Sequence, residues 1–335
     1  MDKATNYVKS MHKMLTKWAT RACLALLAIL AMALIACGDR EAPKKVRLQA
    51  DSPHVSEARE RKNPADTPFK FGFDHRLSPK DDVRIYLPFT QYLDRQTGHR
   101  FSIKFTEKYE ETADNLGRGL IQFAALGPVN CVMAKAKYGA DCLAMGLNQD
   151  GKPEYRAVIF ARQDSSLKTL EDLRGKTFAF GDRFSTQGHV IPRNMLEKKG
   201  VTLKDLRGYV FTGSHANTAK AVLNGEYEAG AIQDVLADRL SREGRIKILA
   251  VSKPYPSSLI CAAKGVDPVT LAAVKKALLA MDPKGIHQNL LVDWDRTEMP
   301  SGFVAYQENS LREIEGLTTR YLDLPAPSPT RLPYP

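Results

Sequence analysis

Hydroxyl, amide and glycine residues gather just after a strand-like apolar segment, Phe178–Phe180. Ser185, Thr186, Gln187 and Gly188 follow that segment across a predicted turn. Serine and threonine are favoured at helix N-caps, where unpaired N–H groups and the helix dipole attract anions. The two hydroxyls can also donate to an oxyanion, and a glycine lets a ligand approach the backbone. The pattern predicts an anion-binding helix start, with simple capping by the two hydroxyls as the alternative.

Two further loops of similar composition follow predicted strands. His215 lies after Tyr209–Phe211, where a histidine at a helix start could donate to an anion or instead bond to a nearby carbonyl. Asn130 lies after Phe123–Leu126, in a loop that could equally be a plain strand-to-helix turn. Because ligands of open α/β sheets collect at strand ends, the three loops together favour one shared site.

Sequence motifs that could indicate catalysis lack the neighbouring residues and secondary structure that their chemistry requires. Gly146–Lys152 has the spacing of a phosphate-binding loop, but Pro153 stands where the magnesium ligand belongs. The apolar run Ala157–Phe160 then predicts a strand where that loop needs a helix. Ser214 precedes His215 but no acidic partner can be named, so a phosphoester hydrolase is only a distant alternative. There is also no Gly-x-Ser-x-Gly, no His-Glu-x-x-His and no Gly-x-Gly-x-x-Gly after a strand, so we expect no enzyme activity and no cofactor. With no Cys-x-x-Cys and no zinc-ligand spacing, we expect no metal.

The N-terminal segment is predicted to be an export signal. Cationic residues precede the apolar run Ala22–Ile35, which is too short to cross a bilayer comfortably, and Cys37 follows it. This arrangement resembles a bacterial lipobox, which implies removal of residues 1–36 and lipidation of Cys37; a signal anchor or a chance apolar run is the alternative. Residues 37–68 are polar and nearly free of aromatics, which predicts a flexible tether. The expected location is the periplasmic face of the cell envelope, at the inner or outer membrane.

Charge and cysteine content narrow the class of partner. The chain of 335 residues has a formal net charge of +11 and 43% hydrophobic residues, as in an ordinary globular protein. The positive surplus is spread along the chain, which suits a small anionic ligand or an anionic surface better than nucleic acid. Cys131, Cys142 and Cys261 follow the N-terminal segment, and an oxidising compartment permits one disulfide among them. We expect the Cys131–Cys142 pair.

Strand-like and helix-like segments alternate along the chain, which predicts a layered α/β fold. The expected strands are 69–73, 101–105, 121–126, 157–161, 177–180, 209–211, 229–232 and 246–251. The expected helices lie within 82–97, 130–138, 170–173 and 219–223, and before Gly200. Helices are expected to dominate from Pro268 to Tyr321, and 324–335 is a proline-rich peripheral tail.

Several segments together resemble the phosphate/phosphite/phosphonate-binding proteins of ABC importers. The most specific is Phe-Gly-Asp-x-x-Ser-Thr-x-Gly-His-x-x-Pro at 180–192, followed by Gly-Ser-His-Ala-Asn at 213–217. Further matching parts are Tyr86–Phe89, Ala125–Pro128, Gly151–Tyr155 and Leu170–Lys176. The resemblance covers roughly residues 69–260 and continues more weakly to 322.

The resemblance implies a type II periplasmic binding protein. Such proteins have two α/β lobes, each a mixed sheet flanked by helices, joined by two crossover strands and closing on a ligand by hinge motion. The first lobe is expected at 69–160 plus 255–323, and the second at 161–254. The resemblance also implies that a phosphorus oxyanion is held, through charge-assisted hydrogen bonds, by Tyr109, Tyr155, Ser185, Thr186 and His215.

The sequence departs from that family where the substituent of the anion is read. Relatives that take aminoalkyl phosphonates carry acidic side chains farther along the second lobe, whereas the matching stretch Gly230–Val235 offers only Asp234. Ala216 also stands beside His215 where relatives often have an acid. Because an ammonium would lack a charged partner, we expect an anion with a small or weakly cationic substituent.

The leading hypothesis is a monomeric, membrane-tethered solute-binding lipoprotein that captures phosphonate, phosphite or phosphate and delivers it to an ABC permease. A second hypothesis keeps the same binding lobes but has their closure sensed by a signalling partner in the membrane. Both hypotheses place the ligand on the same residues, and neither requires the ligand to be transformed.

Overall fold

The computed structural model describes residues 67–106 and 111–322. Several features expected from the sequence lie outside the described residues. They are the signal segment 1–36, the lipidation site Cys37, the tether up to residue 66, the ligand contact Tyr109 and the tail 324–335. Within the described ranges, no helix is long and apolar enough to cross a bilayer.

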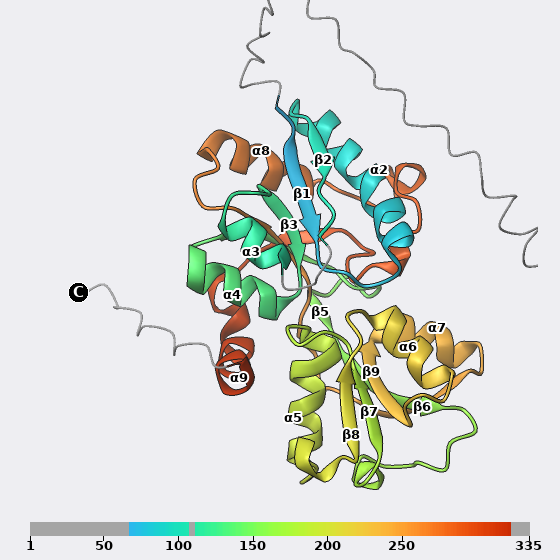
Figure 1. Cartoon of the computed structure of the whole chain (residues 1–335). Helices are drawn as coiled ribbons and strands as arrows, with labels where there is room; N and C mark the ends of the chain where they lie inside the picture. Colours follow the sequence, from blue (N-terminus) through green and yellow to red (C-terminus); the bar gives the residue numbers. More distant parts are fainter. Residues whose placement is uncertain (1–66, 107–110, 323–335) are drawn as a thin grey trace, which may run out of the picture. The chain divides into compact units, whose positions relative to one another are not determined.

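A six-stranded mixed sheet forms the first of two layered bodies (Figure 1). In spatial order its strands are β13 (Phe303–Ala305), β4 (Asp141–Gly146), β12 (Leu259–Ala262), β3 (Phe123–Leu126), β1 (Phe69–Phe73) and β2 (Phe101–Ile103). Strand β1 pairs in parallel with β2 and β3, whereas β12 runs antiparallel to β3 and β4, and β13 runs antiparallel to β4. We call this sheet, with the helices packed on it, the first lobe.

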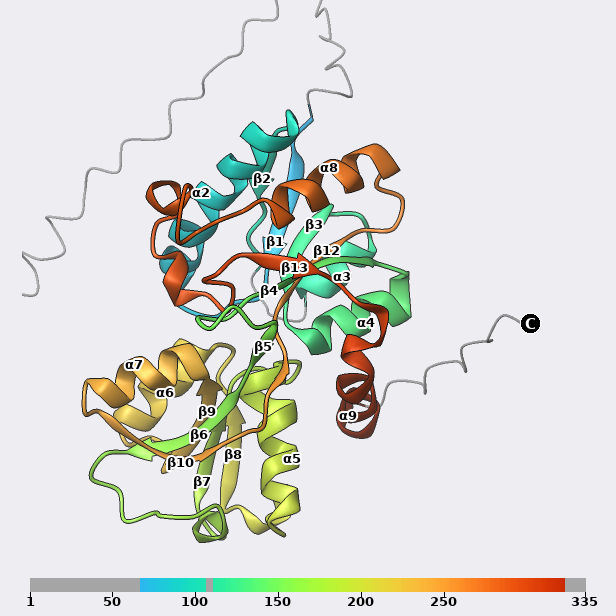
Figure 2. The same ribbon diagram turned by 180° about the vertical axis from the view of Figure 1, so that it is seen from behind.

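Helices cover both faces of this sheet (Figures 1 and 2). On one face lie α2 (Pro79–Thr97) and α8 (Pro268–Leu279); on the other lie α3 (Glu111–Gly117), α4 (Pro128–Tyr138) and α9 (Arg312–Leu322). Phe123 and Ala125 of β3 pack in the core with α2 and α8, whereas Ala124 and Leu126 pack in the core with α3, α4 and α9. Successive residues of a strand point to opposite faces, so an apolar run such as β3 joins two cores.

The start and the end of helix α2 are determined by its local sequence. Ser78 caps its start, because its hydroxyl accepts a hydrogen bond from the Asp81 amide at 3.2 Å. Pro79 takes the first helical position, where no N–H is needed. Gly98 ends the helix with a φ of 71°, a conformation that glycine adopts without strain.

A five-stranded sheet forms the second body, which with its helices we call the second lobe. In spatial order its strands are β10 (Ile246–Val251), β6 (Ala157–Arg162), β9 (Ala229–Gln233), β7 (Thr177–Phe180) and β8 (Gly208–Phe211). Strand β7 pairs in parallel with β8 and β9, and β6 runs antiparallel to β9 and β10. A π-helical turn, Thr186–Val190, leads into α5 (Ile191–Lys198) on one face; α6 (His215–Leu223) and α7 (Asp234–Arg242) pack on the other.

Two short strands carry the chain between the lobes. Strand β5 (Glu154–Tyr155) leads from β4 to β6, and β11 (Tyr255–Pro256) leads back from β10 to β12. The two strands pair with each other antiparallel. Because β6 begins at Ala157, the second sheet starts a few residues before the lobe boundary expected at 161.

Some elements differ from the sequence expectation. Phe303–Ala305 is a strand inside a stretch expected to be dominated by helices, because it pairs with β4, a partner far away in the sequence. The expected helix at 170–173 is a single 3₁₀ turn, Glu171–Leu173. Further 3₁₀ turns lie at Leu203–Asp205, Gln288–Leu290, Trp294–Arg296 and Glu308–Leu311. Gly146–Lys152 leads into β5 rather than a helix, which confirms that it is no phosphate-binding loop.

The expected disulfide between Cys131 and Cys142 is wrong: both residues, and Cys261, are free thiols. The Sγ atom of Cys261 lies 3.1 Å from that of Cys131 and 3.9 Å from that of Cys142. Strand pairing explains the difference, because the register of β12 on β4 sets Cys261 opposite Cys142, while α4 carries Cys131 onto the same core. Closeness in the sequence was therefore a poor guide to closeness of the sulfurs.

The packing of β9 against β7 and α6 depends on a glycine. A Cβ added at Gly230 would lie 2.9 Å from the Ala179 carbonyl oxygen and 2.9 Å from Thr218 Cγ2. The first of these atoms belongs to the backbone of the neighbouring strand and cannot move aside cheaply. We therefore predict that Gly230→Ala lowers the free energy of unfolding by about 1–3 kcal/mol, measured by thermal or urea denaturation.

The matched control is Gly208→Ala, a glycine at the start of β8 whose added Cβ meets no heavy atom within 4 Å. Its effect should stay within about 0.5 kcal/mol. Equal melting temperatures for the two variants would show that the close contact at Gly230 does not limit stability.

Candidate ligand-binding site

Three loops of the second lobe meet at one edge of its sheet. Because β7, β8 and β9 run parallel, their carboxyl ends point the same way. The residues that follow these ends include Thr186 after β7 and His215 after β8, and Gln233 is the last residue of β9. This pairing sets the first two of the three loops singled out in the sequence at the same edge of one sheet.

The first lobe presents a corresponding edge to these loops. Its parallel strands β1 and β3 are followed by Arg76 and Val129 respectively. The Val129 amide donates a hydrogen bond to Thr186 Oγ1 at 3.0 Å, and the Ala216 amide donates to the Arg76 carbonyl oxygen at 3.2 Å. The carboxyl-end loops of the two sheets therefore touch each other directly.

Ser185 caps the helical turn that follows it. Its hydroxyl accepts a hydrogen bond from the Gly188 amide at 2.9 Å. A Cβ at Gly188 would lie 2.9 Å from the Gly181 Cα, and the Gly181 amide donates to the Gly188 carbonyl at 2.9 Å. Glycine is thus needed at 188 for close backbone packing, and its amide already has a partner. Of the two roles expected for the Ser185 hydroxyl, anion binding and helix capping, the structure shows capping. The amide that it caps belongs to Gly188.

Thr186 joins the two lobes to the crossover strand. Its side chain is buried, accepts from the Val129 amide, and shares a hydrogen bond with the Tyr155 hydroxyl. Burial raises the pKa of Tyr155, and the bond to Thr186 opposes that rise only in part. Tyr155 therefore stays a neutral phenol, able to donate a hydrogen bond at the point where the lobes meet.

His215 and Gln233 carry buried polar atoms that lack a partner among the described residues. These atoms are Nδ1 of His215 and both polar atoms of the Gln233 amide. Burial, and then the charge of Arg76, lower the pKa of His215 to about 3, so the ring is neutral at physiological pH. Leaving a buried polar group without a partner costs about 1–3 kcal/mol, so such groups mark a place where a partner is expected.

Arg76 brings a buried cation to the same place. Its Nη1 donates to the Asp74 carbonyl at 2.7 Å, its Nη2 donates to Ser258 Oγ at 2.9 Å, and its Nε pairs with the Glu298 carboxylate. Its charge contributes to the pKa shifts of both His215 and Tyr155. The Arg76–Glu298 pair is nearly inaccessible to solvent, so its field is little screened by water.

Asn130 holds the start of α4 in place. Its Nδ2 donates to Asp74 Oδ1 at 2.8 Å, and the other oxygen of Asp74 accepts from the Gly127 amide at 2.7 Å. Both side chains are fully buried. Asn130 therefore positions the loop that carries Val129, and Asp74, which the sequence analysis did not single out, is its partner.

Asp234 is bound to the backbone of the crossover segment. Its Oδ2 accepts from the Arg156 amide at 2.7 Å, and its Oδ1 accepts from the Val235 amide at 3.0 Å. Gln187 adds a bond to the same carboxylate at 3.4 Å and donates to the Arg156 carbonyl at 3.0 Å. Burial raises the pKa of Asp234 to about 6, while the amide bonds oppose that rise. Asp234 and Gln187 thus fasten α7 and the π-helical turn to the crossover.

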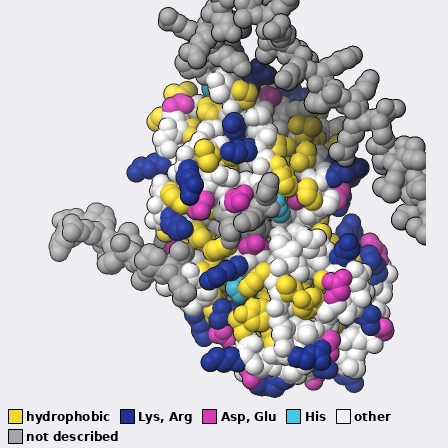
Figure 3. Space-filling model, viewed as in Figure 1, with side chains coloured by type: hydrophobic (Ala, Val, Ile, Leu, Met, Phe, Trp, Pro, Cys, Tyr) yellow, Lys and Arg dark blue, Asp and Glu magenta, His cyan; other side chains and the backbone are white. Residues whose placement is uncertain are grey.

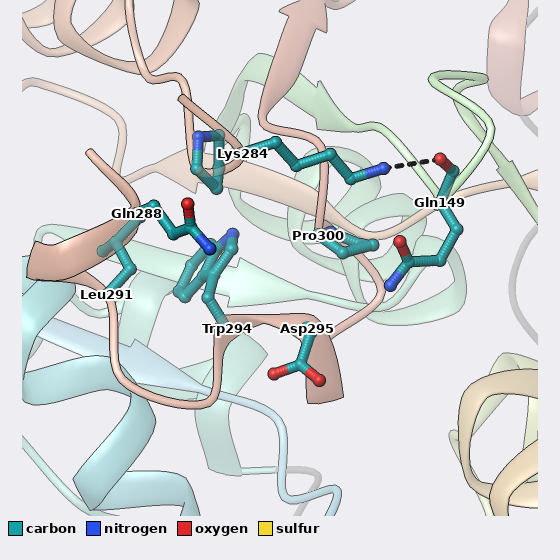
Figure 4. Close-up of a pocket in the computed structure, with 8 residues that line it drawn as sticks. Gln149, Lys284, Gln288, Leu291, Trp294, Asp295 and Pro300 are labelled. Atoms are coloured by element: carbon teal, nitrogen blue, oxygen red, sulfur yellow. Dashed lines mark hydrogen bonds between the residues drawn. The ribbon is translucent and has the colours of Figure 1, made fainter. Parts of the chain in front are cut away.

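Cavities lined by described residues lie on both sides of the crossover segment. One, of about 210 Å³, is lined from both lobes and reaches Tyr155, Asp234 and Glu298. Another, of about 340 Å³, lies among Gln149, Trp294 and neighbouring residues of the first lobe (Figure 4). A further one, of about 450 Å³, is lined by residues that include Val235 and Arg239.

Of these three cavities, the first is lined by residues expected from the sequence, namely Tyr155 and Asp234. Thr186, His215 and Gln233 line none of the three. The loop contacts therefore define the candidate site, and the first cavity lies next to it at Tyr155.

Ser214 does not have the surroundings of a catalytic nucleophile. Its hydroxyl accepts a hydrogen bond from the Asn217 amide at 3.1 Å and caps α6. The neighbouring His215 ring has a low pKa and no bonded carboxylate to orient it. Tyr109, the remaining expected ligand contact, lies outside the described residues.

Curated relatives of the chain are solute-binding proteins of importers. It is 26% identical over 207 residues to the phosphate-import protein PhnD of Mycolicibacterium smegmatis, a match that covers 57% of this chain and 64% of that protein. It is 28% identical over 197 residues to the probable ABC transporter phosphite binding protein PhnD1 of Prochlorococcus marinus, covering 55% of this chain and 60% of that protein. The chain therefore matches somewhat less than two thirds of the length of each relative.

Solved structures of related proteins share the two-lobed fold. PhnD1 of Prochlorococcus marinus in complex with methylphosphonate superposes with a TM-score of 0.70 at 19% identity, covering 78% of this chain and 99% of that structure. A binding protein component of an ABC phosphonate transporter from Pseudomonas aeruginosa gives a TM-score of 0.69 at 21% identity, covering 77% of this chain and 87% of that structure. These likenesses confirm the expected type II periplasmic binding protein fold.

A family model described as the periplasmic substrate-binding protein of phosphonate ABC transporters matches residues 71–309, which span both sheets and the touching loops. The chain therefore belongs to the family of periplasmic substrate-binding proteins of phosphonate ABC transporters.

Proposed function

We propose that this protein captures a phosphorus oxyanion between its two lobes and delivers it to an ABC permease. The observation that carries the proposal is the set of buried polar atoms on His215 and Gln233 that have no partner in the described part of the chain, at the edge where the loops of both sheets meet. Family membership supports the class of ligand, since the relatives are named for phosphate import and phosphite binding.

Hydrogen-bond donors and a buried positive charge together suit an anion. The imidazole of His215, the amide of Gln233 and the phenol of Tyr155 can each donate without carrying a charge. Arg76 adds a buried positive charge, which is paired with Glu298 in the structure. Hydrogen bonds to an ionised ligand are about twice as strong as neutral ones, and the dry surroundings strengthen them further.

Entry of the ligand requires the lobes to part. The direct contacts that would open are the bond from the Val129 amide to Thr186 and the bond from the Ala216 amide to Arg76. The paired crossover strands β5 and β11 are the natural hinge, because within residues 67–106 and 111–322 the chain passes between the two sheets through these segments. We assign contact with the anion to four residues: Thr186, Tyr155, His215 and Gln233. A second group holds the surrounding loops in position: Ser185, Gln187, Gly188, Asn130 and Asp234.

The pocket favours an anion with a small, uncharged substituent. Asp234 already accepts from the amides of Arg156 and Val235 and from Gln187, so it is poorly placed to pair with an ammonium. Gln233 offers an amide where an acid would be needed. A buried ammonium without a carboxylate partner is costly, so methylphosphonate, phosphite and phosphate are preferred over aminoalkyl phosphonates. Lipidation of Cys37 would hold the binding protein at the membrane, close to its permease.

The first test measures the melting temperature of the purified protein with and without methylphosphonate, phosphite or phosphate. Binding to the folded state alone stabilises it by about 2.7 kcal/mol when the ligand exceeds Kd a hundredfold. At least one anion should therefore raise the melting temperature, and His215→Ala should abolish the rise. Absence of a shift with all three anions would contradict the proposal.

Gln233→Leu separates binding from folding. Replacing the unpartnered amide by an apolar side chain of similar size should leave the melting temperature of the empty protein unchanged or raise it. The same change removes a hydrogen bond to the ligand, so Kd for the preferred anion should rise about 10- to 100-fold, measured by calorimetry.

The matched control is Gln163→Leu, which alters an exposed glutamine on the same lobe and should leave Kd unchanged. If Gln233→Leu lowered the melting temperature and kept the affinity, the Gln233 side chain would be a packing residue only.

Gln233→Glu should change ligand choice. A carboxylate at this position repels the anion but offers a partner to an ammonium, so methylphosphonate binding should weaken while 2-aminoethylphosphonate loses less or gains. The quantity to compare is the ratio of the two Kd values in the parent and variant proteins. An unchanged ratio would place the substituent of the ligand away from Gln233.

A further inference from the structure

Three cysteines from separate elements of the first lobe converge in its core. Cys131 lies on α4, Cys142 on β4 and Cys261 on β12. Their three Sγ atoms all lie within 4.8 Å of one another. Cys131 and Cys261 are buried, whereas Cys142 is partly buried.

The sulfur spacing fits three thiolates around one ion. A thiolate bonds zinc at about 2.3 Å, which places the sulfurs of a three-thiolate site about 4 Å apart. The 3.9 Å spacing from Cys261 to Cys142 matches that value, whereas the 3.1 Å spacing from Cys261 to Cys131 is shorter and must widen when an ion binds. A disulfide would use only two of the three sulfurs and leave the third thiol next to a bond that it could attack.

The charge of such a site is small. Three thiolates and a divalent cation carry one net negative charge. Lys135 lies one helical turn beyond Cys131 and forms an ion pair with Glu308, so the side chains next to the cluster already balance each other.

We propose that Cys131, Cys142 and Cys261 bind a soft divalent metal ion of the zinc class as three thiolates. Binding exchanges the remaining thiol protons for the metal and involves no oxidation or reduction. Three cysteines leave the fourth position of a tetrahedral ion to water or another ligand. The ion would tie α4 to β4 and β12, and so brace the helix whose first turn, through Val129, contacts Thr186. This proposal is independent of the identity of the anionic ligand.

Cadmium titration of the reduced, metal-free protein tests the proposal. Cadmium bonds thiolates as zinc does and gives an ultraviolet thiolate-to-metal charge-transfer band. One ion should bind per chain with that band, the melting temperature should rise, and zinc should compete for the same site. Cys142→Ser should weaken binding by more than about 100-fold, because losing even an outer partner of a metal ligand costs 10- to 100-fold.

Cys142→Ser is the most informative variant because its partly buried position tolerates a hydroxyl. The metal-free variant should melt close to the metal-free parent, and it retains every other cysteine of the chain, so any binding elsewhere would persist in it. The proposal is overturned if the reduced protein takes up no cadmium with a thiolate band, or if Cys142→Ser binds as tightly as the parent. Peptide mapping that finds most of the exported protein with a Cys131–Cys261 disulfide would also overturn it.

Discussion

The direct contact between the carboxyl-end loops of two sheets is the constraint on which this structure depends. Strands β7, β8 and β9 of the second lobe end at one edge because they are parallel, and β1 and β3 do the same in the first lobe. The bonds from Val129 to Thr186 and from Ala216 to Arg76 then join the two edges. Polar backbone and side-chain groups that would face water in a single lobe thereby become buried, which is where an anion gains most from them.

The electrostatics at this contact suit capture rather than catalysis. Burial and the charge of Arg76 keep His215 neutral, and burial keeps Tyr155 protonated, so both are available as uncharged hydrogen-bond donors. Ser214 is used to cap α6. Lys and Arg side chains are scattered among acidic ones on the face of the molecule shown in Figure 3, so attraction of the anion rests on the local arrangement around Arg76.

The sequence alone predicts the loops of the site better than their individual side chains. Strand-then-helix patterns and the rule for parallel strands place Thr186 and His215 at one edge of the second sheet, whereas Asn130 follows a strand of the first sheet. Arg76 and Gln233 also follow or end strands and could have been found by the same rule, but they lack the serine, threonine and glycine signature used to choose loops. Glu298 has no local signal, because its role depends on pairing with a residue more than two hundred positions earlier in the chain.

Residue roles that depend on packing between distant segments could not be predicted from local sequence patterns either. A glycine is required at 188 because its backbone lies against Gly181. Asp234 is required because it accepts a hydrogen bond from an amide of the crossover segment. Neither contact can be predicted from the spacing of residues in the sequence. The cysteine cluster shows the same limit, since the register of β12 on β4 decides which sulfurs meet.

A crystal structure of the protein grown with its preferred phosphorus oxyanion tests the central claim most directly. The account predicts anion oxygens within about 2.7–3.2 Å of His215, Gln233 and Thr186, with the lobes closed over them. An anion bound elsewhere, such as in the cavity beside Trp294, with the polar atoms of His215 and Gln233 still unpartnered, would contradict it.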